Sequence, residues 1–446
     1  MKLPKKRVYT ILSTSLFLML TAAAFLGPAY FSEVLPAEPV AVLPEAAPAL
    51  LVSTKKISPQ EMALLDTENR LSVEFAVPRG MEKRVAFWLD VYTKYDSRNY
   101  IIHHREYPWI VFDVVDTSDI FAQPRSHKWM NRQDADTLSQ VKKDAVIATL
   151  KMLLVRSNET NLSPEEARVL ALINEIPGPR KKVLREAIKA LRIQLGQKDM
   201  FEMGLVRSAP FIPAMEQIFQ GKGLPRELVR LPLVESSFNI DAHSRVGAKG
   251  AWQIMPGIGR KGMMIDNVID ERDSPLKSTQ FAAFILKQNK QILKTWPLAV
   301  TAYNHGTGSL LKAIKKLKSQ ELQDIIDLNN EKSFQFASSN FYACFMAALR
   351  GELYAKELFP ELKRPEPLRL TRVKVSKKTS VSSFAKQSGL DLKSLQAANP
   401  DLPNNLRPSF QIPSGFYLYV PQEKQVSLEN TVSSLTPSAP LLVLDR

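Results

Sequence analysis

An acidic residue continues the apolar face of a predicted helix. The turn at Gly223-Leu224-Pro225 is suited to opening a helix, and Glu235 occupies the next helical position after the stripe formed by Leu224, Leu228 and Leu231. Burial disfavours a charged carboxylate, so Glu235 should have a raised pKa and could donate a proton near neutral pH. The same periodicity allows a structural glutamate paired with Arg230. Pro232, one turn earlier, should kink the helix beside the carboxylate.

Two glycine-containing segments downstream have the composition of a ligand-binding cleft. Residues 244–256 combine two glycines inside the segment with Trp252 and Gln253, and Tyr303 and Asn304 come directly before a glycine-rich turn. Glycine allows a backbone to approach a ligand closely, and a glutamine amide both donates and accepts hydrogen bonds. A tryptophan offers a face on which a sugar ring can lie. Together these segments favour a carbohydrate cleft.

The three segments also resemble a known family. Val234-Glu235-Ser236-Ser237-Phe238, the stretch 244–256 and Ala302-Tyr303-Asn304 are similar to the signature blocks of the lytic transglycosylase domain, which is lysozyme-like. The blocks occur in the family's order and separations, and the resemblance covers about residues 205–315. The chain looks most like the membrane-bound lytic murein transglycosylases of the D type, which carry peptidoglycan-binding repeats at the C-terminus.

The resemblance assigns a role to each site residue. Glu235 is expected to be the sole catalytic acid and base, and five residues are expected to bind substrate: Ser244, Gln253, Met255, Tyr303 and Asn304. The sequence departs from the family at two positions. In many members an acidic residue opens the helix after the third block, but the matching region here, Ser338-Ser339-Asn340-Phe341-Tyr342, has no carboxylate. His305 stands where the family usually has a small residue.

A single acid restricts the reaction. Hydrolytic glycosidases of the retaining and inverting classes need two carboxylates, and the signature blocks contain no second acid. The candidates for one, Asp270, Glu271 and Asp273, belong to a charged loop. The resemblance therefore implies non-hydrolytic cleavage of the β-1,4 bond between N-acetylmuramic acid and N-acetylglucosamine, which leaves 1,6-anhydromuramyl ends. A catalytically silent peptidoglycan-binding scaffold and a hydrolytic muramidase on the same fold remain alternatives. No metal, nucleotide or organic cofactor is expected.

Composition limits the class of protein and its partners. With 446 residues, of which 45% are hydrophobic, the chain is neither wholly disordered nor a polytopic membrane protein. Its 60 Lys and Arg against 45 Asp and Glu suit an anionic partner. Charge alone does not choose among a cell-wall polymer, nucleic acid and lipid headgroups, although the even spread of basic residues and the export segment described below argue against nucleic acid. The family resemblance implies peptidoglycan glycan strands as the partner. The single cysteine, Cys344, excludes a disulfide framework and is expected to be buried and inert.

The N-terminus has the features of an export segment. Four basic residues precede an uncharged, mostly apolar run at 8–31, so residues 1–31 are predicted to be a signal peptide or a membrane anchor. Cleavage and retention both remain open. Either outcome places the protein in the bacterial cell envelope, in the periplasm, with an anchor to the inner membrane if the segment is retained. Residues 32–62, rich in proline and alanine, are predicted to be an extended linker.

The predicted fold is mainly α. Residues 63–199 should form a mostly helical N-terminal domain with short strands near 100–102 and 109–112. Its helices are predicted at 136–156, after the capping box at Ser163-Pro164, and from Arg180 to about residue 195. Residues 200–358 should form the lysozyme-like catalytic domain, which the pattern again predicts to be helical.

A small C-terminal unit is predicted at 368–422. Strands at 372–375 and 416–420 should enclose helices at 381–388 and 392–398, and this βααβ order resembles a LysM domain, a chitin- and peptidoglycan-binding module. Lys378-Thr379-Ser380 replaces the usual Gly-Asp-Thr, so the copy is degenerate, and a plain packing module is the alternative. Residues 423–446 are predicted to be a flexible tail.

Overall fold

The computed structural model describes residues 57–125, 127–156, 161–329, 331–424 and 435–437. The predicted export segment at 1–31 lies outside the described residues, as does most of the predicted linker. Pro59, the last proline assigned to that linker, instead opens helix α1 (Pro59–Leu65), because Ser58 and Glu61 form a reciprocal capping box around it. None of the helices in the described part of the chain has both the length and the apolar character needed to cross a membrane.

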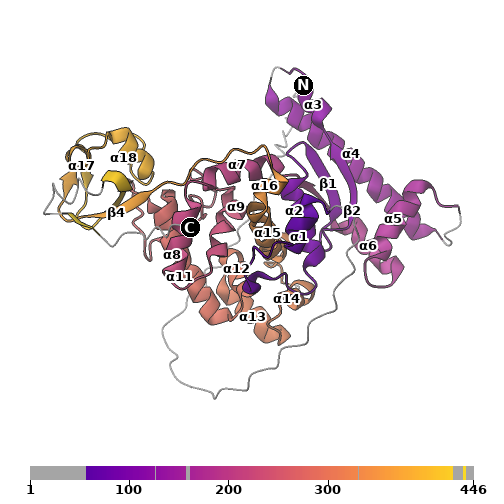
Figure 1. The fold of residues 1–446 in the computed structure, drawn as a ribbon. Helices are drawn as coiled ribbons and strands as arrows, with labels where there is room; N and C mark the ends of the chain where they lie inside the picture. The colour runs from indigo at the N-terminus through magenta and orange to yellow at the C-terminus, as the bar shows by residue number, and fades with distance from the viewer. Residues whose placement is uncertain (1–56, 126, 157–160, 330, 425–434, 438–446) are drawn as a thin grey trace, which may run out of the picture.

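The prediction of a mainly α fold is confirmed. Figure 1 shows a central group of helices, with α4 to α6 projecting on one side and the unit that contains α17 and α18 on the opposite side. Within the described residues, buried side chains gather in three hydrophobic clusters that follow the same division. The central helices are therefore flanked by two other regions, either of which could influence a site among these helices.

The N-terminal region combines helices with a small antiparallel sheet of order β2-β1-β3. Its strands are β1 (Asn99–His104), β2 (Val111–Asp116) and β3 (Leu191–Leu195). Its helical elements are α1, η1 (Val73–Phe75), α2 (Glu82–Thr93), α3 (Ser118–Ala122), α4 (Lys128–Val155), α5 (Pro164–Asn174) and α6 (Arg180–Ala190).

The strands predicted near 100–102 and 109–112 are confirmed as β1 and β2, but the helix predicted to reach about residue 195 ends earlier. Helix α6 ends at Ala190, and residues 191–195 form β3, which pairs with β1 from Tyr100 to His104. The unpaired edge of β1 needs a partner for its backbone groups, and this requirement overrides the helical pattern.

The central body is formed by helices around α15 (Phe336–Leu353), most of which is buried and which packs against α1, α2, α9 and α12. Cys344 lies within α15 and is buried, as expected. The other elements of this body are α7 (Lys198–Ser208), α8 (Ile212–Gln220), η2 (Arg226–Arg230), α9 (Leu231–Ser236), α10 (Pro256–Gly259), η3 (Glu271–Asp273), α11 (Pro275–Leu293), α12 (Trp296–His305), α13 (Thr307–Leu317), α14 (Leu322–Leu328) and α16 (Ala355–Leu358).

The C-terminal unit has the predicted βααβ order. Helices α17 (Val381–Ser388) and α18 (Leu392–Ala398) lie between β4 (Leu370–Val375) and β7 (Tyr417–Pro421), which pair antiparallel. A short pair, β5 (Thr379–Ser380) and β6 (Gln411–Ile412), completes the unit, and η4 (Gln422–Lys424) follows it. Strand β8 (Leu435–Pro437), inside the predicted flexible tail, pairs with the other edge of β4.

Candidate active site

The predicted single helix before Glu235 is divided in two. A 3-10 segment, η2, ends at Arg230, and the short helix α9 begins at Leu231 with Pro232 in its first turn. Proline is tolerated there because the first backbone N–H groups of a helix have no intrahelical partner, so Pro232 opens a new helix and does not kink an existing one. The helix ends at Ser237, whose φ of 49° is left-handed, and Glu235 therefore lies in the last turn.

The interpretation of Glu235 as the partner of Arg230 is wrong. The Arg230 guanidinium is buried and forms ion pairs with Glu216 and with Glu352, whose Oε2 lies 2.9 Å from Nη2. Arg230 is thus paired with residues of α8 and α15, and burial is the cause of the raised pKa of Glu235. The Glu235 carboxyl on α9 therefore does not have Arg230 as a partner.

The Glu235 carboxyl is placed as a proton donor. Its Oε1 is buried, with no hydrogen-bond partner among the described residues, while the residue as a whole remains partly exposed. Burial raises the pKa of Glu235 to about 8, and burial is the cause identified for this shift. The carboxyl is therefore largely protonated at neutral pH, and a ligand can still reach the residue.

The loop at 242–256 lies next to α9. Ser236, the neighbour of Glu235, donates a hydrogen bond from Oγ to the backbone oxygen of Ala251 at 2.9 Å. Within the loop, Ser244 Oγ accepts from the backbone N–H of Ala248 at 2.8 Å. Gln253, at a left-handed φ of 48°, donates from Nε2 to the carbonyl of Gly250 at 2.9 Å. These bonds fix the loop beside the carboxyl.

Two of the predicted binding residues in this loop are partly exposed, but Trp252 differs from the prediction. Met255 is half-buried directly before α10, and Gln253 is also half-buried. Trp252, expected to offer a face to a sugar ring, is fully buried: it stacks on Phe219 and donates from Nε1 to Thr279 Oγ1 at 2.8 Å. Trp252 belongs to the central hydrophobic cluster, whose other members come from distant parts of the chain. The local sequence pattern therefore did not indicate its burial.

The end of α12 completes the arrangement. Tyr303 donates from its hydroxyl to the backbone oxygen of Trp252 at 2.9 Å. Burial raises the pKa of Tyr303 well above its usual range, and the negative charge of ionised Glu235 adds to the shift, so the two side chains are electrostatic neighbours. Asn304 Oδ1 accepts from Ser338 Oγ at 3.3 Å.

Ser338 is a site residue whose contribution the sequence did not reveal. Its hydroxyl contacts Asn304 and also lies 3.0 Å from Nδ1 of His305. The two departures from the family pattern, Ser338 and His305, are therefore in contact with each other. The signal available in the sequence was that both positions depart from the family pattern, whereas their contact is visible only in the structure.

Two of the three downstream acids considered from the sequence, Asp270 and Asp273, are paired with cations. Arg272 binds both carboxylate oxygens of Asp270, at 2.9 and 2.8 Å. Lys249 lies 2.6 Å from Asp273 and 3.3 Å from Asp270. A carboxylate held by these cations cannot easily serve as a second catalytic group.

The part of the chain that contains this site is similar to known proteins. The family model of the transglycosylase SLT domain matches residues 215–326, which include η2, α9, the 242–256 loop and α12. Membrane-bound lytic murein transglycosylase D of Escherichia coli strain K12 is 37% identical over 117 residues, covering 26% of each chain. The same protein from strain CFT073 gives the same values.

A third relative is shorter. A putative tributyltin chloride resistance protein of an Alteromonas species is 30% identical over 144 residues, which are 32% of this chain and 70% of that protein. This chain spans about a quarter of the length of the transglycosylases that it matches. On these matches and the site geometry, the chain belongs to the family of proteins built on the transglycosylase SLT domain, which it carries at residues 215–326.

Proposed function

We propose that the protein is a peptidoglycan lytic transglycosylase. The observation that carries the proposal is the Glu235 carboxyl: the residue is partly exposed, its Oε1 is buried, and burial raises its pKa to about 8. A general acid is most effective when its pKa lies near the working pH. The transglycosylases that match this domain carry that activity in their names, which supports the same activity here.

The proposed reaction uses one acid twice. Glu235 protonates the β-1,4 glycosidic oxygen between N-acetylmuramic acid and N-acetylglucosamine, and the bond from C1 to that oxygen breaks. The acetamido oxygen of the muramyl residue then bonds to C1 and stabilises the positive charge. The ionised Glu235 takes the proton of the C6 hydroxyl, O6 bonds to C1, and the acetamido group is released. No water is consumed, and the product is a 1,6-anhydromuramyl end.

A one-acid route agrees with the surroundings of Glu235. Hydrolysis by the retaining or inverting route requires a second carboxylate at a defined separation. Asp270 and Asp273 are held by Arg272 and Lys249. The substrate's own acetamido group therefore takes the part that a nucleophilic carboxylate has in a retaining hydrolase.

The remaining site residues are proposed to bind the sugars. Ser244, Gln253 and Met255 are half-buried along the loop that Ser236 ties to α9, where they can line the cleft and orient the acetamido group. Tyr303 and Asn304 approach from α12, and Ser338 holds the Asn304 amide.

Products of digested sacculi decide among the three functions considered. Wild type should release muropeptides with 1,6-anhydro ends, each lighter by one water than the reducing-end equivalent, and Glu235→Gln should release none above background. Glu361→Gln, at an exposed glutamate outside the site, is the matched control and should behave as wild type. Reducing ends from wild type would instead identify a hydrolytic muramidase. Equal release by wild type and Glu235→Gln would contradict catalysis by Glu235, and no release from either would favour a scaffold.

The location of the protein and the role of its C-terminal unit are also proposals. We place the protein in the bacterial envelope, exported by residues 1–31, which then either anchor it or are removed. The unit at 368–422 is proposed to bind peptidoglycan, as its LysM resemblance implies. A cavity of about 480 Å³ beside it is lined by amides, a guanidinium and an aromatic ring, groups that suit a sugar.

A further inference from the structure

Residues 264–274, here called the bridging segment, lie between the candidate active site and the C-terminal unit. Ile269 is 3% exposed and belongs to the hydrophobic cluster of the C-terminal unit, together with Val373 and Phe416. The backbone N–H of Asp270 lies 3.4 Å from the carbonyl oxygen of Asp401. The C-terminal unit is thus in direct contact with the SLT domain and is not suspended from a linker.

A buried ion pair closes this contact. Lys277, at the start of α11, is 7% exposed, and its Nζ lies 2.5 Å from Oδ2 of Asp401, whose side chain is fully buried. The same Nζ lies 3.6 Å from the ring centroid of Phe416 and 3.5 Å from Glu271. Removing one partner of a buried pair leaves a charge without compensation, which is strongly unfavourable. The pair therefore resists separation of the two units.

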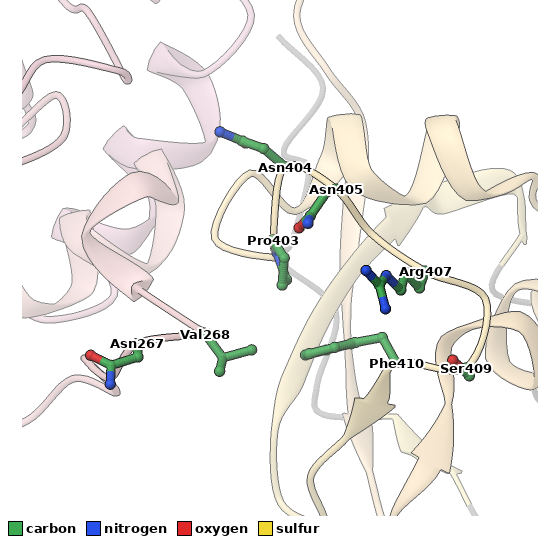
Figure 2. Close-up of a pocket in the computed structure, with 8 residues that line it drawn as sticks. All are labelled: Asn267, Val268, Pro403, Asn404, Asn405, Arg407, Ser409 and Phe410. Atoms are coloured by element: carbon green, nitrogen blue, oxygen red, sulfur yellow. The ribbon is translucent and has the colours of Figure 1, made fainter.

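The junction also has an open side. A cavity of about 480 Å³ lies here, lined by Asn267 and Val268 of the bridging segment and by residues that include Arg407 and Phe410 of the C-terminal unit. Figure 2 shows the Val268 side chain pointing toward Phe410. The packing is therefore closed around Asp401 and open at the tip of the bridging segment. This places the mechanical connection at Asp401 and Lys277.

The opposite side of the bridging segment contacts the loop at 242–256, here called the cleft loop. Arg272 is 5% exposed and donates from Nη1 to the carbonyl oxygens of Gly247, at 2.7 Å, and Ile254, at 3.0 Å. Both carbonyls belong to the loop that carries Ser244 and Gln253. The packing is close: a Cβ added at Gly250 would lie 1.9 Å from the carbonyl oxygen of Arg272. The loop therefore cannot keep its shape if the bridging segment moves.

We infer that Asp401 of the C-terminal unit is a positioning residue for the cleft loop of the SLT domain, acting through Lys277 and the bridging segment. The expected effect on catalysis rests on the proposed function, whereas the expected effect on the structure of the cleft loop does not depend on it. The C-terminal unit then has a second role besides any contact with the cell wall. It forms part of the support that holds Ser244 and Gln253 beside Glu235.

The test separates support of the loop from attachment to the cell wall. Wild type, Asp401→Asn, Lys277→Met and the double variant Lys277→Met/Asp401→Leu are compared on soluble, uncrosslinked glycan fragments, for which attachment to an insoluble wall is irrelevant. Hydrogen exchange of residues 242–256 is followed in parallel, at a temperature well below each variant's unfolding transition. The double variant is included because replacing a whole buried pair by apolar side chains usually preserves folding.

Each folded variant should exchange the loop amides at least severalfold faster than wild type, and kcat/KM should fall about tenfold or more, since small displacements of positioning groups have effects of this size. The double variant should lose no more than either single variant, because the pair acts as a unit. Lys393→Gln, on the exposed face of α18, is the control and should match wild type. A folded double variant with wild-type loop exchange and wild-type kcat/KM would overturn the inference. If wild type cleaves nothing, the proposed function fails, but the exchange comparison still decides the role of Asp401.

Discussion

At the scale of single residues, the important property is that the Glu235 carboxyl is shielded from solvent without forming an ion pair with Arg230. Arg230, the cation closest in sequence, is engaged by Glu216 and Glu352, so the pKa of Glu235 is set by burial. A carboxyl in this state keeps its proton at neutral pH, and once the proton leaves it is a stronger base than an ordinary carboxylate. Both properties are needed if one residue is to act as the acid and then as the base.

This property has a cost in stability that depends on pH. The pKa of Glu235 is about 8 in the folded protein and near 4.5 when the chain is unfolded. Between these values the folded state binds more protons, so the contribution of Glu235 to stability becomes less favourable as the pH rises. Glu235→Gln should therefore gain in melting temperature relative to wild type from pH 5 to 8, with little further change above pH 8.

Thermal unfolding at a series of pH values measures this difference, with Glu361→Gln as the control that should show no such trend. A difference between Glu235→Gln and wild type that is constant over the same range would mean that Glu235 titrates normally in the folded protein.

At the scale of elements, the division of the predicted helix into η2 and α9 aims two charged residues in different directions. Arg230 closes η2 and enters the interface with α8 and α15, while Glu235 lies one turn beyond the start of α9. Glu352 on α15 also pairs with Arg364, at 3.0 Å, so this interface is a small buried network. The network holds α9 in position without neutralising its carboxyl.

Arg230→Met should destabilise the protein strongly. It leaves Glu216 and Glu352 near an apolar side chain, and breaking a buried pair in this way costs about 3–5 kcal/mol. Lys83→Met removes a matched but exposed pair, with Glu175, and should change the free energy of unfolding by at most about 1 kcal/mol. Denaturant unfolding measures both. A small effect of Arg230→Met would mean that the network does not hold α9.

At the scale of the whole molecule, the three hydrophobic clusters are joined by single strands or segments. On β1, Ile101 packs into the central cluster, while Ile102 packs into the N-terminal one, because alternate residues of a strand face opposite sides. Ile269 makes the corresponding connection to the C-terminal unit. The SLT domain is therefore held between two other regions, each of which contacts it through buried side chains.

Binding to the cell wall should depend on the cavity at the C-terminal junction. In a Glu235→Gln background, which should leave sacculi intact, Arg407→Gln should lower the fraction of protein bound to sacculi severalfold, because a guanidinium facing the cavity can donate several hydrogen bonds to a sugar or a carboxylate. Lys393→Gln removes the same charge elsewhere on the unit and should bind as the parent does. Equal loss in both variants would indicate binding by net charge, and loss in neither would exclude this cavity as a contact.

Much of the fold and the place of the acid could be predicted from local patterns. The capping box at Ser163 lies in a single turn, and the βααβ order of the C-terminal unit follows from short-range periodicity. The position of Glu235 on an apolar stripe was likewise visible without a structure. Its role and those of the five predicted binding residues stay predictions until variants are measured.

What the sequence determined by itself is what depends on neighbours along the chain: helix starts, strand alternation, and an acidic side chain on an apolar face. Only the tertiary structure decided the features that depend on distant partners. It turned residues 191–195 into a strand beside β1, buried Trp252 against Phe219, and joined Asp401 to Lys277. Pairing, burial and charge compensation are set by residues far apart in the chain, and periodicity carries no information about which of them meet.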